Sequence, residues 1–330
     1  MRLSIAVVFL GLLLAGSPAL LRADAYDPLL VDPHFLAATQ EFVVHDSGRD
    51  RDIPVLVYLP ATTNPAPIVL FSHGLGGTRF GSPFLGRHWA ARGYAAVFVQ
   101  HPGSDDSVWK DIPVADRLGA MQKAASLDNF LLRVRDVPAV INQLEQWNTT
   151  PGHPLAGRLD LKNIGMSGHS FGAVTTEALC GETLPLSGRE FTDTRLSAAL
   201  VLSPSLPSSG SGARAFGQVT IPWLLMTGTL DKAPIGHATV ASRREVYQAL
   251  KGAPKYELVL NRAEHSVFTD NSLPGEHEPR NPNHHRVILA LSTAFWDAYL
   301  KHDSAALAWL QGPGPRAVME SADQWQLQDH

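Results

Sequence analysis

The sequence contains a single cysteine, Cys180, among its 330 residues. One thiol cannot form an intramolecular disulfide, and it cannot supply the cysteine cluster of a structural zinc site. Cys180 falls at the far end of a predicted helix, so we interpret it as a small buried side chain rather than a reactive thiol. The pair His284 and His285 follows Pro282 as at a helix start and has no acidic partner at ligand spacing. The sequence therefore predicts a protein without a metal and without another cofactor.

The chain also has little net charge, because its acidic and basic residues nearly balance. The chain has 27 Lys and Arg against 31 Asp and Glu, which gives a formal net charge of −4. No run of basic residues stands out, which argues against nucleic acid or an anionic membrane as a partner. A hydrophobic content of 45% excludes an intrinsically disordered chain. This balance fits small, neutral or weakly polar substrates better than polyanions.

The N-terminal apolar run, residues 3–14, is too short to cross a bilayer comfortably. It follows a basic residue and precedes the small residues 23–25, an order that is typical of a signal peptide. We therefore predict that residues 1–25 are removed and that the mature chain begins near Tyr26. An uncleaved membrane anchor is the alternative. We expect a secreted or periplasmic protein without stable membrane insertion after cleavage, and a single domain over residues 26–330.

Short β-like runs alternate with longer helix-like segments along the mature chain. The predicted strands cover residues 53–58, 67–71, 94–99, 163–167, 198–202, 221–226 and 256–260. The predicted helices cover residues 84–92, 127–147, 171–178, 240–250 and 287–300. This alternation predicts an α/β fold with a mostly parallel central sheet and helices on both faces. The pair of runs near residues 42–58 suggests an antiparallel edge.

Two details of this layout stay open. Pro138 lies inside the helical pattern of residues 127–147 and is expected to kink that helix or to mark a helix start. Residues 104–125 are the longest piece without an assignment. They follow a strand at the carboxyl edge of the predicted sheet, so we expect them to form part of a pocket rim or a small cap.

Residues 168–172 form a G-x-S-x-G motif, GHSFG. The motif alone is weak evidence, because glycine and serine are common here. Its context is stronger, since it directly follows a predicted strand and opens a predicted helix, as the nucleophile elbow of the α/β-hydrolase fold requires. Ser170 is therefore the predicted nucleophile. The alternative is a glycine-rich turn that has no chemistry.

A serine hydroxyl needs a base to become a nucleophile, and in this fold the order along the chain is Ser, then an acid, then His. Asp231 and His265 each follow a predicted strand directly, so both should lie at the same sheet edge as Ser170. We predict His265 as the general base and Asp231 as the acid that orients it. Asp270 is the rival acid, but no strand precedes it. Glu264 would point away if His265 points inward.

An oxyanion hole needs two backbone N–H donors. The residue after the nucleophile, Phe171, is predicted to supply one of them. The loop after the strand at residues 67–71 reads SHGLGG over residues 72–77, and its glycines let the backbone approach a substrate closely. Leu75 in that loop is the predicted second donor, with a simple glycine-rich turn as the alternative.

Three further histidines, His73, His101 and His169, lie at predicted strand ends near this site. They are candidates for lining the site. Their positions are more easily interpreted as packing around the turns, and we assign them no chemical role.

With residues 72–76 (SHGLG) and 168–172 (GHSFG) together, the chain resembles bacterial dienelactone-hydrolase-like esterases related to plasma platelet-activating-factor acetylhydrolase, over about residues 53–265. It resembles secreted cutinase-like polyester hydrolases more loosely, through its late Asp and His loops. The resemblance implies a metal-free serine esterase or lipase of the α/β-hydrolase superfamily that acts on acyl esters, with Leu75 and Phe171 forming the oxyanion hole.

Two positions depart from the pattern of these relatives. Dienelactone hydrolases use a cysteine where this chain has Ser170. In the acetylhydrolase the acid follows the strand after the nucleophile helix, where this chain has Ser203 and Pro204, so that the acid stands one strand later at Asp231. The first departure argues against dienelactone hydrolysis itself, and the second weakens any transfer of phospholipid specificity.

The sequence as a whole predicts an exported serine hydrolase that cleaves carboxylic esters through an acyl-enzyme intermediate. The substrate would be a small-molecule ester or a lipid-like or polymeric one. Two alternatives remain, a peptidase or amidase of the same fold and a catalytically inactive binding protein on the same scaffold.

Overall fold

The computed structural model describes residues 26–31, 35, 37–185, 188–207 and 210–329. The predicted signal peptide, residues 1–25, lies outside the described residues. Within the described part of the chain, no helix is long and apolar enough to span a membrane.

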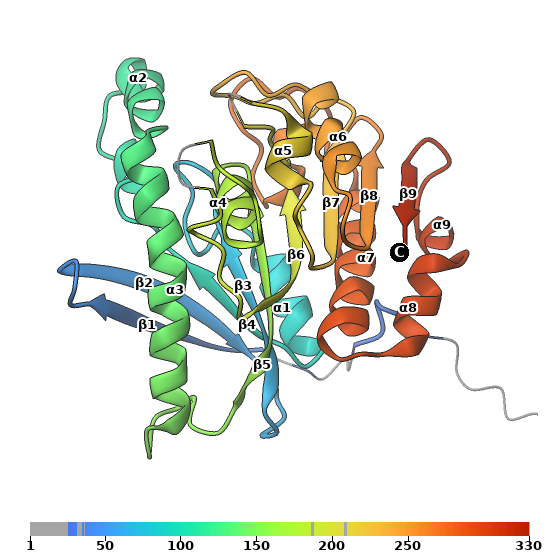
Figure 1. Ribbon diagram of the computed structural model, residues 1–330. Helices are drawn as coiled ribbons and strands as arrows, with labels where there is room; N and C mark the ends of the chain where they lie inside the picture. The colour runs from blue at the N-terminus through green and yellow to red at the C-terminus, as the bar shows by residue number, and fades with distance from the viewer. Residues whose placement is uncertain (1–25, 32–34, 36, 186–187, 208–209, 330) are drawn as a thin grey trace, which may run out of the picture.

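A nine-stranded sheet runs through the described residues in the order β1-β2-β4-β3-β5-β6-β7-β8-β9 (Figure 1). The strands are β1 Ala38–Asp46, β2 Arg51–Leu59, β3 Ala66–Ser72, β4 Ala95–Val99, β5 Leu159–His169, β6 Leu196–Leu202, β7 Trp223–Gly228, β8 Lys255–Leu260 and β9 Gln324–Gln328. The six strands from β4 to β8 in this order are mutually parallel. Strands β1, β2 and β9 pair antiparallel at the two edges. The predicted α/β class, the mostly parallel sheet and the antiparallel edge are thereby confirmed.

Helices cover both faces of the sheet, as predicted. They are α1 Pro83–Ala91, α2 Val114–Ala124, α3 Leu127–Thr149, α4 Phe171–Leu179, α5 Gly212–Phe216, α6 Val240–Ala249, α7 Pro282–Leu300, α8 Ser304–Gln311 and α9 Gly314–Val318. Buried side chains of α3, α4 and α6 form one hydrophobic core with the sheet. Those of α1, α7 and α8 form a second core on the opposite face. Strands β3 and β4 are buried on both sides, which explains their continuous apolar sequences.

The structure corrects the expectation for one segment, assigns elements to another and adds a strand. Helix α3 passes through Pro138 as one helix of 23 residues, so a helix start at Pro138 is wrong. The buried stripe of α3 explains this, because its packing offsets the roughly 3 kcal/mol that an interior proline costs. Residues 104–125, unassigned from the sequence, contain the 3₁₀ turn Asp106–Val108 and helix α2. The short polar strand β9 was not predicted.

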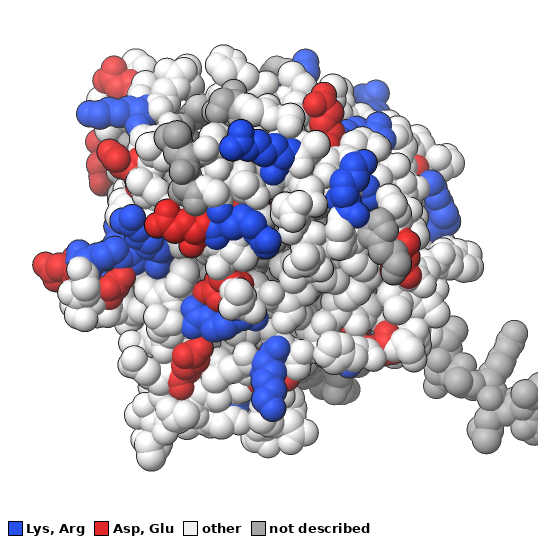
Figure 2. Space-filling model, viewed as in Figure 1, with Lys and Arg blue, Asp and Glu red and all other residues white. Residues whose placement is uncertain are grey.

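The carboxyl ends of the parallel strands meet at one edge of the sheet, which is the upper edge in Figure 1. The loops that carry the predicted site residues all leave the sheet there. Figure 2 shows acidic and basic side chains interspersed over the face in view, in keeping with the small net charge.

Two carboxyl groups are buried together near the end of α4. Glu177 and Glu182 are both almost inaccessible to solvent. The backbone N–H of Ser205 donates to Glu177 Oε1 over 2.9 Å, whereas Oε2 of Glu182 has no hydrogen-bond partner among the described residues. Burial raises the pKa of Glu177, as does the neighbouring Glu182, and burial raises the pKa of Glu182 to about 7.

This pair should make the folded state less stable as the pH rises. The raised pKa values let the folded chain keep protons that the unfolded chain has lost, so the free energy of unfolding should fall between about pH 4.5 and pH 7. We expect Glu182→Gln to reduce this fall. Relative to the native protein, the free energy of unfolding of the variant should be higher at pH 8 than it is at pH 4. Urea unfolding at a series of pH values measures the slope. Identical slopes for the two proteins would contradict the prediction.

Candidate active site

Ser170 stands at the sharp turn between β5 and α4. Its backbone has φ 57° and ψ −114°, a region that residues with a side chain rarely adopt. Such a conformation costs about 1–3 kcal/mol and persists only where its surroundings hold it. Ser170 N–H donates to the carbonyl of Leu202 at the end of β6, over 3.0 Å, which fixes the turn against the neighbouring strand. Ser170 is half-buried, so part of the residue remains open to solvent.

The glycines on either side of Ser170 are required by close backbone contacts. A Cβ on Gly172 would overlap the carbonyl of Ser72 at the end of β3. A Cβ on Gly168 would overlap the carbonyl of Gly172 and would lie 2.8 Å from Thr176 Oγ1. Helix α4 can therefore begin directly against β3 only because these two positions lack side chains.

The structure brings Ser170, His265 and Asp231 together in a hydrogen-bonded chain. His265 Nε2 lies 2.9 Å from Ser170 Oγ, and His265 Nδ1 lies 2.6 Å from Asp231 Oδ1. These residues follow β5, β8 and β7, which all end at the same edge of the sheet. A proton can pass from the serine hydroxyl to the imidazole, while the carboxylate stabilises the resulting positive charge.

The carboxylate of Asp231 is fully buried and well supplied with donors. The hydroxyls of Ser203 and Thr227 donate to Oδ2 over 2.7 and 2.8 Å, and Arg243 Nε lies 3.1 Å from Oδ1. Burial alone would raise the pKa of Asp231, but His265 and Arg243 hold it well below its ordinary value. Because the carboxylate stays ionised and only accepts, the proton of His265 belongs on Nδ1, and Nε2 is free to accept from Ser170.

The two rival acids lie elsewhere. Asp270 is exposed, and its backbone N–H donates to the carbonyl of Gly81. The carboxylate of Glu264 accepts from the backbone N–H groups of His277 and Glu278, so it points away from the His265 ring. Of the three acids considered from the sequence, only Asp231 reaches the imidazole.

The glycine loop after β3 passes directly over the serine. A Cβ on Gly74 would lie 3.3 Å from Ser170 Cβ. The next residue, Leu75, has no acceptor for its backbone N–H among the described residues. Phe171 is the first residue of α4, where a backbone N–H has no acceptor within the helix. Both predicted N–H donors are thus close to the serine and available to a ligand.

Residues 104–125 hold this loop in place. Gly76 N–H donates to the carbonyl of Ser104 over 2.8 Å, and Trp109 Nε1 donates to the carbonyl of Gly76 over 2.7 Å. Gly76 has a φ of 70°, and a Cβ there would lie 2.6 Å from Met121 Cε in α2. The segment that the sequence left unassigned therefore packs on the loop that carries Leu75.

The three histidines at strand ends pack around the turns, as expected, and each is nearly inaccessible. His169 Nε2 bonds the carbonyl of His265 over 2.9 Å and so links the loops of the serine and the histidine. His73 accepts from the backbone N–H of His101 over 3.1 Å. Burial lowers the pKa of His169 to about 3 and that of His101 to about 4, so both rings are neutral at ordinary pH.

Sequence reasoning missed two buried arginines beside the site. Arg243 in α6 contacts Asp231, and Arg133 in α3 reaches the glycine loop. A signal for Arg133 existed, because it stands three residues from Asp136 and four from Val137 on the buried stripe of α3. A charged residue on an apolar stripe indicates a buried partner.

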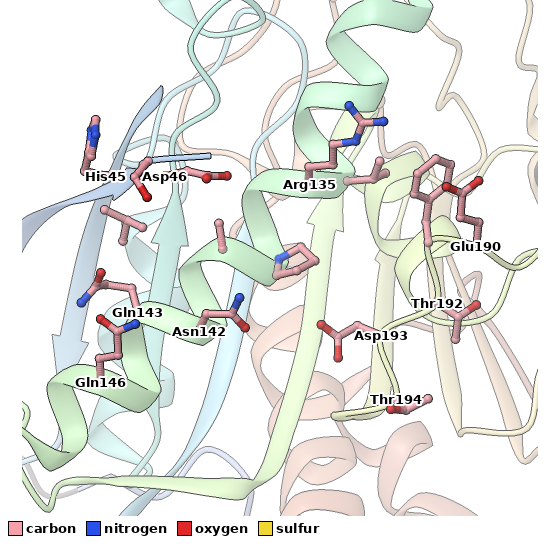
Figure 3. Close-up of a pocket in the computed structure, with 16 residues that line it drawn as sticks. His45, Asp46, Arg135, Asn142, Gln143, Gln146, Glu190, Thr192, Asp193 and Thr194 are labelled. Atoms are coloured by element: carbon pink, nitrogen blue, oxygen red, sulfur yellow. The ribbon is translucent and has the colours of Figure 1, made fainter. Parts of the chain in front are cut away.

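A hollow of about 670 Å³ lies away from this site, along the outer side of α3. Figure 3 shows its walls, which are His45 and Asp46 at the end of β1, polar side chains of α3, and residues 190–194. None of the five predicted site residues lines it. The His45 ring lies 2.9 Å from Asp52, and among the described residues it forms no hydrogen bond with the lining hydroxyls of Ser47, Thr192 or Thr194.

Comparisons with known proteins leave the family open. No protein-family model matches the chain, and no curated protein matches it.

The close contact between Gly172 and Ser72 predicts that one added methyl group at Gly172 will destabilise the protein. Gly172→Ala must push α4 away from β3, so we expect a loss of about 1–3 kcal/mol in the free energy of unfolding, together with most of the reactivity of Ser170. Gly119→Ala in α2 is a matched control, because a Cβ there meets nothing within 4 Å. We expect the control to stabilise the protein by about 0.5–1 kcal/mol. Urea unfolding measures both changes, and a Gly172→Ala protein as stable as the native one would contradict this prediction.

Proposed function

We propose that this protein is a serine hydrolase of the α/β-hydrolase fold that cleaves carboxylic esters. The proposal rests on one observation, the hydrogen-bonded chain from Ser170 Oγ through His265 to the buried Asp231, with the serine on a strained turn. That combination is the one required to activate a serine hydroxyl.

The reaction would proceed in two halves. Ser170 Oγ attacks the ester carbonyl carbon as its proton moves to His265 Nε2, and the tetrahedral intermediate forms. The C–O bond to the alcohol then breaks, and the alcohol leaves with the proton from His265. Water next attacks the acyl-enzyme, with His265 as base, and the acid is released. Throughout, Asp231 stabilises the imidazolium and keeps its tautomer.

The N–H groups of Leu75 and Phe171 would hold the oxyanion of both intermediates. They belong to two different segments, the glycine loop and the start of α4, which meet at Ser170. Such donors stabilise charge that develops only in the transition state, and losing one typically lowers kcat by about 10²–10³-fold.

The substrate we propose is a small-molecule, lipid-like or polymeric ester, met outside the cytoplasm after export and removal of residues 1–25. No nucleic acid and no stable membrane insertion are part of the proposal. A peptidase or amidase would use the same three residues. An inactive binding protein fits less well, because it would have no need of a complete Ser170–His265–Asp231 chain with a strained serine.

The first test is the serine itself. A fluorophosphonate should label the native protein on Ser170, which mass spectrometry of peptides locates, and Ser170→Ala should lower ester hydrolysis by about 10⁶-fold without unfolding the protein. Matched aryl esters and anilides of several acyl lengths separate an esterase from an amidase. An adduct on Cys180, or no adduct at all, would overturn the proposal, and preferred cleavage of the anilide would favour the peptidase alternative.

The second test compares the two acids. Asp231→Asn should lower kcat by about 10⁴-fold, because His265 would lose the carboxylate that fixes its tautomer. Asp270→Asn should change kcat by less than about threefold, because Asp270 is exposed and does not contact the ring. Steady-state kinetics of the two variants on one aryl ester decides between them, and a reversed order would assign the acid to Asp270.

A further inference from the structure

Arg133 is a charged side chain with no exposure to solvent, and the roles proposed above leave it unused. It projects from α3 into the space between the end of β3 and the start of α4. Its Nε donates to Thr175 Oγ1 over 3.1 Å, and Nη1 donates to Ser104 Oγ over 2.9 Å. Its Nη2 donates to Ser72 Oγ over 3.0 Å and also to the carbonyl of His73. Burying a cation is costly unless its donors are used, and here all three nitrogens have partners.

A second Ser–His–Asp chain lies behind Arg133 and contributes to its surroundings. His101 Nδ1 lies 3.0 Å from Asp136 Oδ2, and His101 Nε2 lies 3.0 Å from Ser72 Oγ. Burial alone would raise the pKa of Asp136, but His101 and Arg51 lower it to about 2. Asp136 is therefore ionised, and its negative charge partly compensates the nearby positive charge of Arg133. All three residues of this chain are fully buried. No substrate can reach Ser72, so this chain is structural.

Arg133 connects to both predicted oxyanion donors. On one side it holds the carbonyl of His73, two residues before Leu75, and the hydroxyl of Ser104, whose own carbonyl binds Gly76 N–H. On the other side it holds Thr175, whose hydroxyl donates to the carbonyl of Phe171 over 2.9 Å. The guanidinium carbon also lies 4.7 Å from the centre of the Phe171 ring. One side chain thus links the glycine loop to the start of α4, the two segments whose N–H groups must keep a fixed spacing.

We propose that Arg133 is a positioning residue that sets the spacing of the Leu75 and Phe171 N–H donors, an inference that rests on the hydrolase function proposed above. It does not touch the reacting atoms. Its effect should appear in the transition state, because the two donors bind the tetrahedral oxyanion more strongly than the ground-state carbonyl. A change at Arg133 should therefore lower kcat and leave KM nearly unchanged.

The experiment compares full-length variants with the native protein on one aryl ester. Arg133→Lys keeps the charge but loses the planar fork, and we expect kcat to fall about 10- to 100-fold with KM within about threefold, a smaller effect than the loss of a whole donor. A trifluoromethyl ketone, which forms a tetrahedral adduct with the serine, should bind more weakly by the same factor as kcat/KM falls.

A second set of variants keeps the test decisive if Arg133→Lys does not fold. Thr175→Val removes the hydroxyl that joins Arg133 to Phe171, so kcat of this variant should fall. Thr175→Ser keeps a hydroxyl at this position, so its kcat should be close to the native value. Thr293→Val in α7 is the control, because Thr293 is an equally buried helical threonine, α7 packs on the opposite face of the sheet, and the Thr293 hydroxyl has no hydrogen-bond partner among the described residues. Urea unfolding of each variant shows whether a loss of kcat follows stability.

The outcomes separate this inference from the function. If the native protein neither hydrolyses esters nor reacts with a fluorophosphonate, the proposed function fails. If it does both, and the folded Arg133→Lys and Thr175→Val proteins keep kcat within about threefold of the native value, the positioning role is overturned. A loss that resides in KM, or an equal loss in Thr293→Val, would overturn it as well.

Discussion

The contact between the first turn of α4 and the end of β3 is the constraint on which the rest of the site depends. At Gly172 the helix lies so close to the carbonyl of Ser72 that there is room only for a hydrogen atom. This contact forces the chain to turn within one residue, which places Ser170 in its unusual conformation. It also brings the N-terminus of a helix beside the glycine loop, so that free N–H groups from two segments converge on the serine.

Much of this arrangement could be predicted because its signals are local. Buried parallel strands are continuous apolar runs, as in β3 and β4, and each predicted site residue follows such a run within a few positions. Since parallel strands end at one edge, sequence alone placed Ser170, Asp231 and His265 together, and it preferred Asp231 to Asp270 for the same reason.

The polar framework around the site could not be predicted in the same way. Arg133, Asp136 and Arg243 lie on helices whose pattern indicates only which side is apolar, and their partners stand up to 87 residues away along the chain, as Arg49 does from Asp136. Strand β9 was missed because its partners are non-local as well, and its sequence, QWQLQ, has too few apolar residues to indicate burial. Contacts of this kind depend on the tertiary fold rather than on local propensity.

The single thiol, Cys180, makes the opening of helix α4 measurable by its reaction with a thiol reagent. Cys180 caps the far end of α4, is 2% exposed, and has its pKa raised by burial and by Asp193. A thiol reagent can reach it only when the end of α4 opens, and no other cysteine competes for the reagent. The rate of that reaction, compared with the rate in denaturant, therefore gives the free energy of opening for the helix that follows Ser170, whatever the protein acts on.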